Sequence, residues 1–435
     1  MRHSTFGCMT GLLLALGAAQ AEAQVAMTPR ALGMGGAYDG VARGQEAIFV
    51  NPALLGLTGT PFWSAAFPQV SFGGTMLGTQ FGDLQPMLKY RTATPEQRDQ
   101  ILARIPADGM QAKYDLRSPL AAFQTGNFGI GLSYSSVGQH SVGRDLVELL
   151  FDGYEQGRTN YSVGETRGSR ATFWDVAAAY GRSIGPVSLG VTGHYYRGGT
   201  LLRSMLNEPT YDLNAQDIEV SYRTVMARGG QGYGLDVGAA IQPIASITLS
   251  GSVSNVMSKM TWSDDLRMRT LTMTRDDVDN VTPMDLLERY ELSESSVDPD
   301  GASLSAYAVS QGLYENTDMP STMRLAAAWK SGLGTDIGVS YREELSESRL
   351  GEIWSRSVGA GVQQKVLFTT LRAGYSTDLD SGSMMTGGVS LGPLQLGFAR
   401  IQDGEVDGFE RAGWIGTFGV SVRTTGSMRT PGAIR

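Results

Sequence analysis

The chain has 435 residues, with 57 glycines, 18% charged residues and a net charge of −8. The negative charge argues against nucleic acid as a partner, because phosphate contacts need a basic face. The only cysteine, Cys8, lies near the N-terminus, so disulfides, thiolate metal sites and cysteine nucleophiles are excluded from the remaining chain.

The first residues have the pattern of an export signal. A short polar start precedes an apolar stretch from Gly11 to Ala19, and small-x-small sequences then end at Ala21 and Ala23. The apolar stretch is too short to span a bilayer, which favours a targeting segment over a membrane helix. We therefore expect residues 1–23 to form a signal peptide that is cleaved after Ala23.

Residues 24–60 are rich in glycine and in large apolar residues, unlike an exposed linker. Residues 30–38 read RALGMGGAY, and residues 47–53 read AIFVNPA. Glycines allow tight turns and a close approach of one backbone to another. We expect this segment to fold back into a barrel as a plug or hatch. Its characteristic residues are Gly33, Gly35, Gly36, Asn51, Pro52 and Ala53.

From about Phe62 onward, apolar residues alternate with small or polar ones. Such period-two segments occur at 128–134, 187–195, 233–241, 337–341 and 414–423. This alternation is typical of strands with one apolar face, and the small or charged partners suit a polar lumen. We therefore predict a barrel over residues 61–424, followed by a polar tail at 425–435 that lies in the periplasm.

Short and long connections alternate between these segments. Six are tight: Gly126-Asn127, Gly185-Pro186, Gln242-Pro243-Ile244, Ser331-Gly332-Leu333, Lys365-Val366 and Gly392-Pro393. Seven are longer and polar: Asp83 to Arg117, Gly138 to Arg170, Gly198 to Gly230, Asn255 to Pro320, Arg342 to Ile353, Thr377 to Ser383 and Gln402 to Arg411. Turns on one side and loops on the other are typical of outer-membrane barrels. Together they predict an all-β fold, a transmembrane antiparallel β-barrel of about 14 strands, with Phe62 to Phe81 as a long, glycine-kinked first strand.

Aromatic residues gather toward the expected strand ends, as in the interfacial girdles of membrane barrels. They include Tyr134, Trp174, Tyr180, Tyr195, Trp329, Tyr341, Tyr375 and Trp414. Two loops carry helix signals, at Pro95 to Ile105 and at Met284 to Tyr290.

Seven charged side chains are expected to face the lumen by the same alternation. They are Asp175, Asp236, Arg324, Asp336, Arg356, Arg372 and Arg400. Unpaired charges in lipid are costly, which favours inward placement. We interpret them mainly as ion pairs that brace the hatch; the alternative is that one arginine steers a carboxylate headgroup.

Other chemistry is weakly supported. Gly33 to Gly36 lacks the spacing and the preceding strand of a dinucleotide loop. His140 and His194 have no spaced nucleophile motif, as a serine–histidine hydrolase would need. Acidic residues at 276–279 and 298–300 suggest calcium, but they lack the EF-hand register and are better explained as a solvated loop. We therefore expect no enzyme activity, no cofactor and no metal.

The run Ala31 to Ala37, followed by Asn51-Pro52-Ala53, resembles the FadL family of outer-membrane transporters for long-chain fatty acids and other hydrophobic molecules. The resemblance implies that the N-terminal segment is a hatch that plugs the lumen. It also implies capture of substrate in an outward-facing apolar groove and sideways release into the bilayer. The shuttle barrel of the type IX secretion system shares this hatch motif.

The resemblance therefore implies a passive outer-membrane transporter of long-chain fatty acids or other hydrophobic molecules. Apolar loop residues are the candidates for the capture groove: Leu146, Leu149, Leu150, Phe151, Leu286 and Leu287. The alternative is a non-transporting barrel that acts in protein secretion or as a structural surface protein. The expected location is the outer membrane of a Gram-negative-type bacterium. The expected partners are outer-membrane lipid, a hydrophobic ligand and, during insertion, the barrel-assembly machinery.

Overall fold

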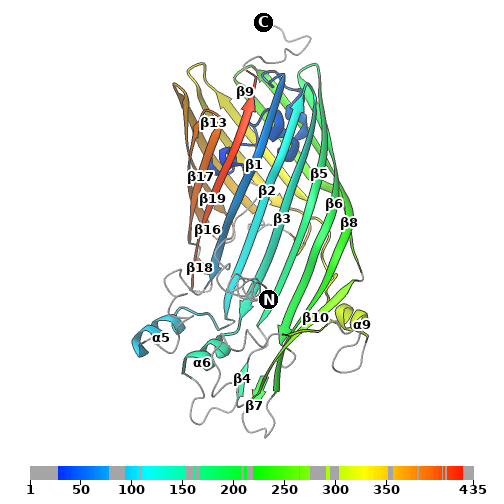
Figure 1. Ribbon diagram of the computed structural model, residues 1–435. Helices are drawn as coiled ribbons and strands as arrows, with labels where there is room; N and C mark the ends of the chain where they lie inside the picture. The colour runs from blue at the N-terminus through cyan, green and yellow to red at the C-terminus, as the bar shows by residue number, and fades with distance from the viewer. Residues whose placement is uncertain are drawn as a thin grey trace, which may run out of the picture.

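A computed structural model describes most of the chain, including the whole region from residue 28 to residue 77 (Figure 1). The described residues are 28–77, 94–107, 109–152, 160–162, 166–206, 210–212, 219–263, 265–274, 291–293, 303–350, 356–379, 382–403, 405–406 and 409–424. The expected signal peptide, the polar tail, the helix at 284–290 and the acidic loop residues lie outside these ranges.

Fourteen antiparallel strands close into a barrel. They are β1 (Trp63–Leu77), β2 (Met110–Thr125), β3 (Phe128–Val142), β5 (Arg167–Ile184), β6 (Val187–Leu206), β8 (Glu219–Ile244), β9 (Ile247–Trp262), β12 (Thr322–Lys330), β13 (Thr335–Glu344), β14 (Arg356–Val366), β15 (Thr369–Asp378), β16 (Gly382–Leu391), β17 (Leu394–Asp403) and β19 (Phe409–Arg423). The first and last strands pair with each other, with Ser64 opposite Arg423, so the sheet has no free edge. The predicted fourteen-stranded barrel is confirmed.

Shorter elements lie at the loop end. The strand β10 (Leu266–Thr274) extends along β8 and pairs with β11 (Glu291–Ser293), while β4 (Asn160–Ser162) pairs with β7 (Thr210–Asp212) and β18 (Glu405–Val406) with β19. The described part of the loops also contains three helices: α5 (Pro95–Leu102), α6 (Arg144–Asp152) and α9 (Leu304–Ser310). The first of these lies where the sequence predicts a helix, and Thr94 and Gln97 form a capping box at its start.

The outer wall carries an apolar band. On β6, Leu189, Val191 and Tyr195 are exposed, whereas the alternating Ser188 and Thr192 are fully buried. This face would be unstable in water but is stable against lipid tails, which identifies the barrel as transmembrane. No described helix is long and apolar enough to cross a membrane.

Aromatic side chains on the outer wall pair across neighbouring strands. Phe128 contacts Tyr180 beside the turns, with 4.7 Å between ring centroids. Farther along the strands, Tyr134 and Trp174 are 5.1 Å apart, and Phe72 and Trp414 are 5.3 Å apart in an edge-to-face arrangement. Rings near both ends of the apolar band suit the headgroup regions of a bilayer.

Two predicted turns are wrong. The β8–β9 turn is at residues 245–246, because β8 continues through Pro243; a register shift between Ile241 and Ile244 removes the need for an N–H at the proline. The β14–β15 turn is Leu367-Phe368, with Leu367 at φ 54°. Because a leucine rarely adopts this left-handed conformation, its residue type gave no turn signal.

The first strand also differs from the prediction. Its register with β19 shifts between Phe67 and Val70, around Pro68, so a proline and not a glycine marks the irregularity. Several loops were predicted too long, because β6 continues to Leu206 and β9 to Trp262.

The wall is much taller on one side than on the other. The strands β12 to β17 contain 9 to 11 residues, which is about the minimum needed to cross a bilayer. On the opposite side β6 has 20 residues and β8 has 26. The tall side therefore continues beyond the membrane at the loop end (Figure 1).

Residues 28–60, here named the luminal segment, lie inside the barrel near the end that carries the turns (Figure 1). The segment contains α2 (Pro29–Gly33), η1 (Gly44–Glu46), α3 (Ala47–Val50) and η2 (Pro52–Gly56). In outer-membrane barrels the turns face the periplasm. The segment therefore occupies the periplasmic half of the lumen.

Inward-facing glycines on the strands make room for this segment. A Cβ on Gly338, Gly361 or Gly374 would lie within 3.0 Å of backbone atoms of residues 34–37, and one on Gly181 or Gly190 would meet Pro52 equally closely. Real Cβ atoms are almost never found at such distances. The high glycine content therefore serves direct packing of the segment's backbone on the wall.

We predict that Gly338→Ala weakens the docking of the luminal segment, because the new methyl group would collide with the carbonyl oxygen of Ala37. Overpacking of this kind costs about 1–3 kcal/mol. The free energy of unfolding in urea should fall by that amount, and permeability to small hydrophilic antibiotics should rise. Gly193→Ala is the matched control, since a Cβ there has nothing within 4 Å. Equal behaviour of the two variants would contradict the packing argument.

Candidate functional site

Two of the four short helices of the luminal segment, α2 and η2, begin with a side-chain cap. Thr28 Oγ1 accepts a hydrogen bond from Ala31 N at 3.2 Å, and Pro29 occupies the first turn. Asn51 repeats the arrangement, since its Oδ1 accepts from Ala53 N at 3.0 Å and Pro52 follows it. Both patterns favour helix initiation. The structural role of the Asn-Pro-Ala motif is therefore to begin a helix.

The predicted hatch residues all lie against the wall or in the turn that leads to it. Gly35 and Gly36 adopt φ values of 63° and 76°, which favour glycine, and Gly35 packs on the backbone of Tyr375. Gly33 lies beside Arg372. Asn51 Nδ2 donates to the carbonyl oxygen of Gly251 at 3.1 Å, so one side chain both caps a helix and binds the wall.

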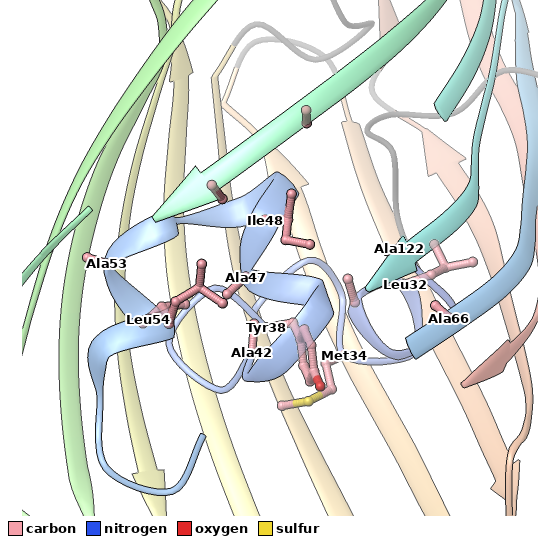
Figure 2. Close-up of a cluster of buried hydrophobic side chains, with 14 of the residues drawn as sticks. Leu32, Met34, Tyr38, Ala42, Ala47, Ile48, Ala53, Leu54, Ala66 and Ala122 are labelled. Atoms are coloured by element: carbon pink, nitrogen blue, oxygen red, sulfur yellow. The ribbon is translucent and has the colours of Figure 1, made fainter. Parts of the chain in front are cut away.

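Apolar side chains of the segment form a core inside the barrel, near the end that carries the turns (Figure 2). Leu32, Met34, Ala47, Ile48 and Leu54 are fully buried. Ala66 and Ala122, on β1 and β2, join this core from the wall. The turn end of the barrel is thus filled as a protein interior and is not lined as an aqueous channel.

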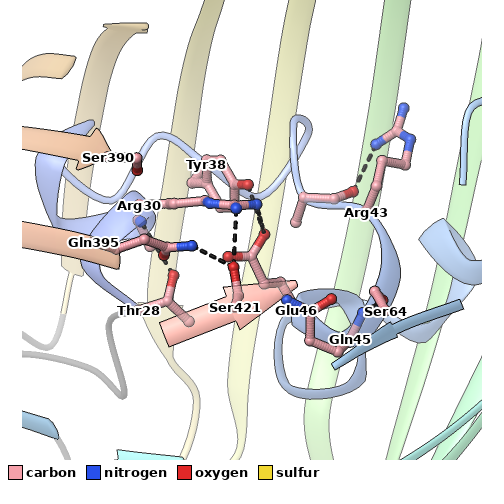
Figure 3. A network of polar contacts seen from close by, with 12 residues as sticks. Thr28, Arg30, Tyr38, Arg43, Gln45, Glu46, Ser64, Ser390, Gln395 and Ser421 are labelled. Atoms are coloured by element: carbon pink, nitrogen blue, oxygen red, sulfur yellow. Dashed lines mark hydrogen bonds and ion pairs between the residues drawn. The ribbon is translucent and has the colours of Figure 1, made fainter. Parts of the chain in front are cut away.

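A buried ion pair ties the start of the segment to its middle (Figure 3). Arg30 Nη1 lies 3.3 Å from Glu46 Oε2, and the hydroxyl of Tyr38 donates to the same oxygen at 2.6 Å. Arg30 also donates to Ser421 Oγ on β19 at 3.0 Å. Glu46 on η1 therefore joins Tyr38 to Arg30 of α2, and Arg30 joins this group to the last strand.

Burial and this shared carboxylate shift the pKa values of the group. Burial alone would lower the pKa of Arg30, but Glu46 and Tyr38 raise it above its ordinary value. Burial, together with Glu46, raises the pKa of Tyr38 to about 12. Both shifts keep Arg30 charged and Tyr38 neutral at physiological pH.

A charged layer lies beyond the luminal segment toward the loop end. His194 on β6 lies between two carboxylates: its Nδ1 is 3.0 Å from Asp175 and its Nε2 is 3.1 Å from Asp236. Asp236 also accepts from the backbone N of Asn255, which has φ 51° at a register shift of β9. Both ring nitrogens of His194 thus face carboxylates and not a hydroxyl, unlike the histidine of a serine hydrolase.

Five of the seven predicted lumen charges face inward. Asp175 and Asp236 belong to the charged layer, and Arg324 donates to Ser254 Oγ at 2.9 Å. Asp336 accepts from Gln363, and Arg372 donates to Ser390 Oγ at 2.7 Å.

The prediction is wrong for two arginines, which face outward. Arg356 shares a face of β14 with the exposed Val358 and Val362, and Arg400 shares a face of β17 with the exposed Leu396 and Phe398. Both lie toward the loop ends of their strands, where a long guanidinium side chain can reach the headgroup region.

Toward the loop end the lumen becomes apolar again. The buried side chains there, here named the outer apolar layer, are Val137, Ala171, Phe173, Tyr196, Leu201, Val225, Ala227, Met260, Trp262, Met268, Leu304, Ala308, Leu313, Met319 and Leu350. They come from six strands of the tall side, from α9 and from residues 313–350 that fold onto them. Sequence reasoning missed this layer, because its members are scattered over strands and loops and share no motif.

The predicted groove residues do not belong to this layer as far as the structure describes them. Leu146 is half-buried on α6, whose neighbour Val147 packs on Ile101 and Ile105 of the α5 region. The side chains of Leu149, Leu150 and Phe151 lie outside the described residues, as do Leu286 and Leu287. Among the described residues, no group of three or more His, Cys, Asp and Glu could hold a metal ion.

Neither a family model nor a curated protein matches this chain. Solved structures do match. The toluene transporter TbuX of Ralstonia pickettii has 13% identity and a TM-score of 0.51, covering 91% of this chain and 98% of its own. The toluene transporter TodX of Pseudomonas putida has 13% identity and a TM-score of 0.51, covering 92% and 98%. At this identity the likeness concerns the fold, and it confirms the predicted FadL-like barrel.

We predict that Arg30→Gln destabilises the protein by about 3–5 kcal/mol, because it leaves the carboxylate of Glu46 buried without its cation. The double variant Arg30→Gln, Glu46→Gln should recover most of the loss. Thermal unfolding of the detergent-solubilised barrels measures both effects, and a double-mutant cycle gives the coupling between the two residues. Additive losses would show that the pair does not act as one unit.

Proposed function

We propose that this chain is an outer-membrane transporter that takes up hydrophobic small molecules, with long-chain fatty acids as one candidate class. The observation that carries the proposal is the order of layers along the lumen. An apolar layer lies at the loop end, a charged layer follows it, and the luminal segment fills the turn end. This arrangement opposes free flow of water-soluble solutes, and a hydrophobic molecule that enters from outside would insert among the buried side chains of the apolar layer.

Capture would take place at the outer apolar layer. Met260, Met268 and Met319 give it flexible side chains that can repack around ligands of different shape. Phe173 and Trp262 add large aromatic surfaces. Each methylene group of a ligand buried there contributes about 0.8 kcal/mol. The printed titles of the TbuX and TodX structures, which name toluene transporters, support a hydrophobic ligand for this fold.

The luminal segment would act as the hatch. Its backbone packs on glycines of the wall, and Glu46 neutralises Arg30 within the lumen. A shift would have to break the wall bonds of Asn51 and Arg30, and also those that Ser183 and Ser188 donate to the carbonyl oxygens of Gly56 and Ala53, both at 2.6 Å.

Sideways release would use the wall between β1 and β2. Their pairing runs through Ala66–Ala122 and resumes only at Ser71–Arg117, and prolines lie on both strands in this interval, at Pro68 and Pro119. Ala66 and Ala122 also contact the core of the luminal segment. A shift of the segment would consequently alter its packing beside this gap in the β1–β2 pairing.

We predict that the protein restores uptake of a labelled long-chain fatty acid in a host that lacks its own outer-membrane fatty-acid transporter. The variant Asn51→Ala, Pro52→Ala should transport less, because it loses the cap and the wall contact of the hatch. Heat-modifiable migration checks that both proteins are folded. Labelled toluene serves as a second substrate. If a folded parent protein takes up neither substrate, the result would favour a role in secretion or surface structure.

We further predict that Met260→Ser lowers uptake several-fold by placing a hydroxyl in the outer apolar layer. Met257→Ser is the matched control on the same strand, since Met257 is 62% exposed. Initial uptake rates at several substrate concentrations separate weaker capture from slower release. Equal rates for the two variants would argue against capture at this layer.

A further inference from the structure

A polar pocket of about 270 Å³ lies at the loop end of the lumen, next to the outer apolar layer. Lys113, Gln139, Ser169 and Arg203 form one row across β2, β3, β5 and β6, each opposite the next in register. Arg167 and Arg349 complete the part of the lining that carries charge. Sequence patterns did not reveal this pocket, because its residues come from five separate segments.

The row and the outer apolar layer share one face of the wall. Gln139 lies two residues beyond Val137, and Arg203 lies two residues beyond Leu201. Arg349 directly precedes Leu350, which is also part of the apolar layer. The polar pocket and the apolar layer are therefore two parts of one continuous inner surface.

Four cationic side chains line the pocket, in a chain whose net charge is −8. Among the described residues, none of the lining groups is a carboxylate. Two acidic groups lie close to the pocket without lining it: Glu315, near Arg349, and Glu344, near Lys113. The lining itself is therefore positively charged, a property that attracts anions.

Two of the arginines converge on one acceptor. Arg203 Nη1 and Arg349 Nη1 both donate to the carbonyl oxygen of Gly312, at 3.2 Å and 2.8 Å. Arg349 Nη2 is buried, and no partner is described for it. Burial, together with the nearby charge of Arg203, lowers the pKa of Arg349 to about 10, so it stays protonated at neutral pH. Two like charges and a spare buried donor are thus held at the edge of a polar cavity.

We propose that this pocket binds a phosphate- or sulfate-bearing headgroup of an amphiphile whose chain lies against the outer apolar layer. The inference deepens the proposed function and rests on it. A tetrahedral oxyanion presents at least three acceptor oxygens, which suits several cationic donors that approach from different strands. Arginine forks are also especially suited to oxyanions of this geometry. Binding would satisfy Arg349 Nη2 and relieve its repulsion with Arg203.

The test is calorimetric titration of the purified protein in a non-ionic detergent with hexyl phosphate, hexanoate, hexanol and inorganic phosphate. Hexyl phosphate should bind at least tenfold more tightly than hexanoate or hexanol, and added salt should weaken its binding. The double variant Arg203→Gln, Arg349→Gln should bind hexyl phosphate no better than hexanol. Arg182→Gln, at an exposed site near the turn end of β5, is the matched control and should bind like the parent.

The double variant Arg203→Lys, Arg349→Lys keeps both charges and guards against misfolding of the loop. It should retain more affinity for hexyl phosphate than the Gln variant does. Equal affinity for hexyl phosphate and hexanol, or unchanged binding in the Gln variant, would overturn the anion site while leaving hydrophobic capture intact. Equal affinity for inorganic phosphate and hexyl phosphate would show that the alkyl chain does not contribute to binding, and would overturn the proposal that the ligand is an amphiphile. Failure of the proposed transport would show itself separately, as no binding of hexanol and no uptake.

Discussion

The structure of this barrel depends on one constraint: the backbone of the luminal segment lies very close to the backbones of the surrounding strands. The luminal segment can enter the lumen only because strands on several sides present glycines where it passes, as Gly338 does for Ala37 and Gly181 does for Pro52. Once inside, the segment gains the burial of Leu32, Ile48 and Leu54, which offsets the entropy of ordering it. The core of the turn end is thus a consequence of missing side chains on the wall.

Polar groups then specify where the segment lies. Backbone packing on glycines has little directional preference, but Asn51 and Arg30 reach particular partners, the carbonyl of Gly251 and the hydroxyl of Ser421. Glu46 balances Arg30 inside the lumen, so neither charge of this pair is left isolated by docking. Adaptable packing and directed bonds together therefore hold the segment in one position against the wall.

The sequence predicted the barrel well and the binding surfaces poorly. Period-two alternation and turn chemistry gave the fourteen strands, and failed locally where Leu367 makes a turn without glycine and where β8 passes through Pro243. The inward placement expected for Arg356 and Arg400 was wrong, because the cost of a charge in lipid does not apply at a strand end where a long side chain reaches the membrane surface. The outer apolar layer and the basic pocket could not be predicted, since residues such as Trp262, Leu304 and Leu350 meet only through long-range pairing and loop folding.

The glycines of the wall also restrict how such a protein can evolve. Every amino-acid substitution at Gly338 or Gly361 adds atoms toward the luminal segment. A mutation there can therefore disrupt the contact, but it cannot create more space. At the loop end, Met260, Trp262 and Arg203 contribute side chains that single substitutions can shorten, lengthen or change in charge. We therefore expect substitutions that adapt the protein to a new ligand to accumulate at the loop end and not where the wall meets the luminal segment.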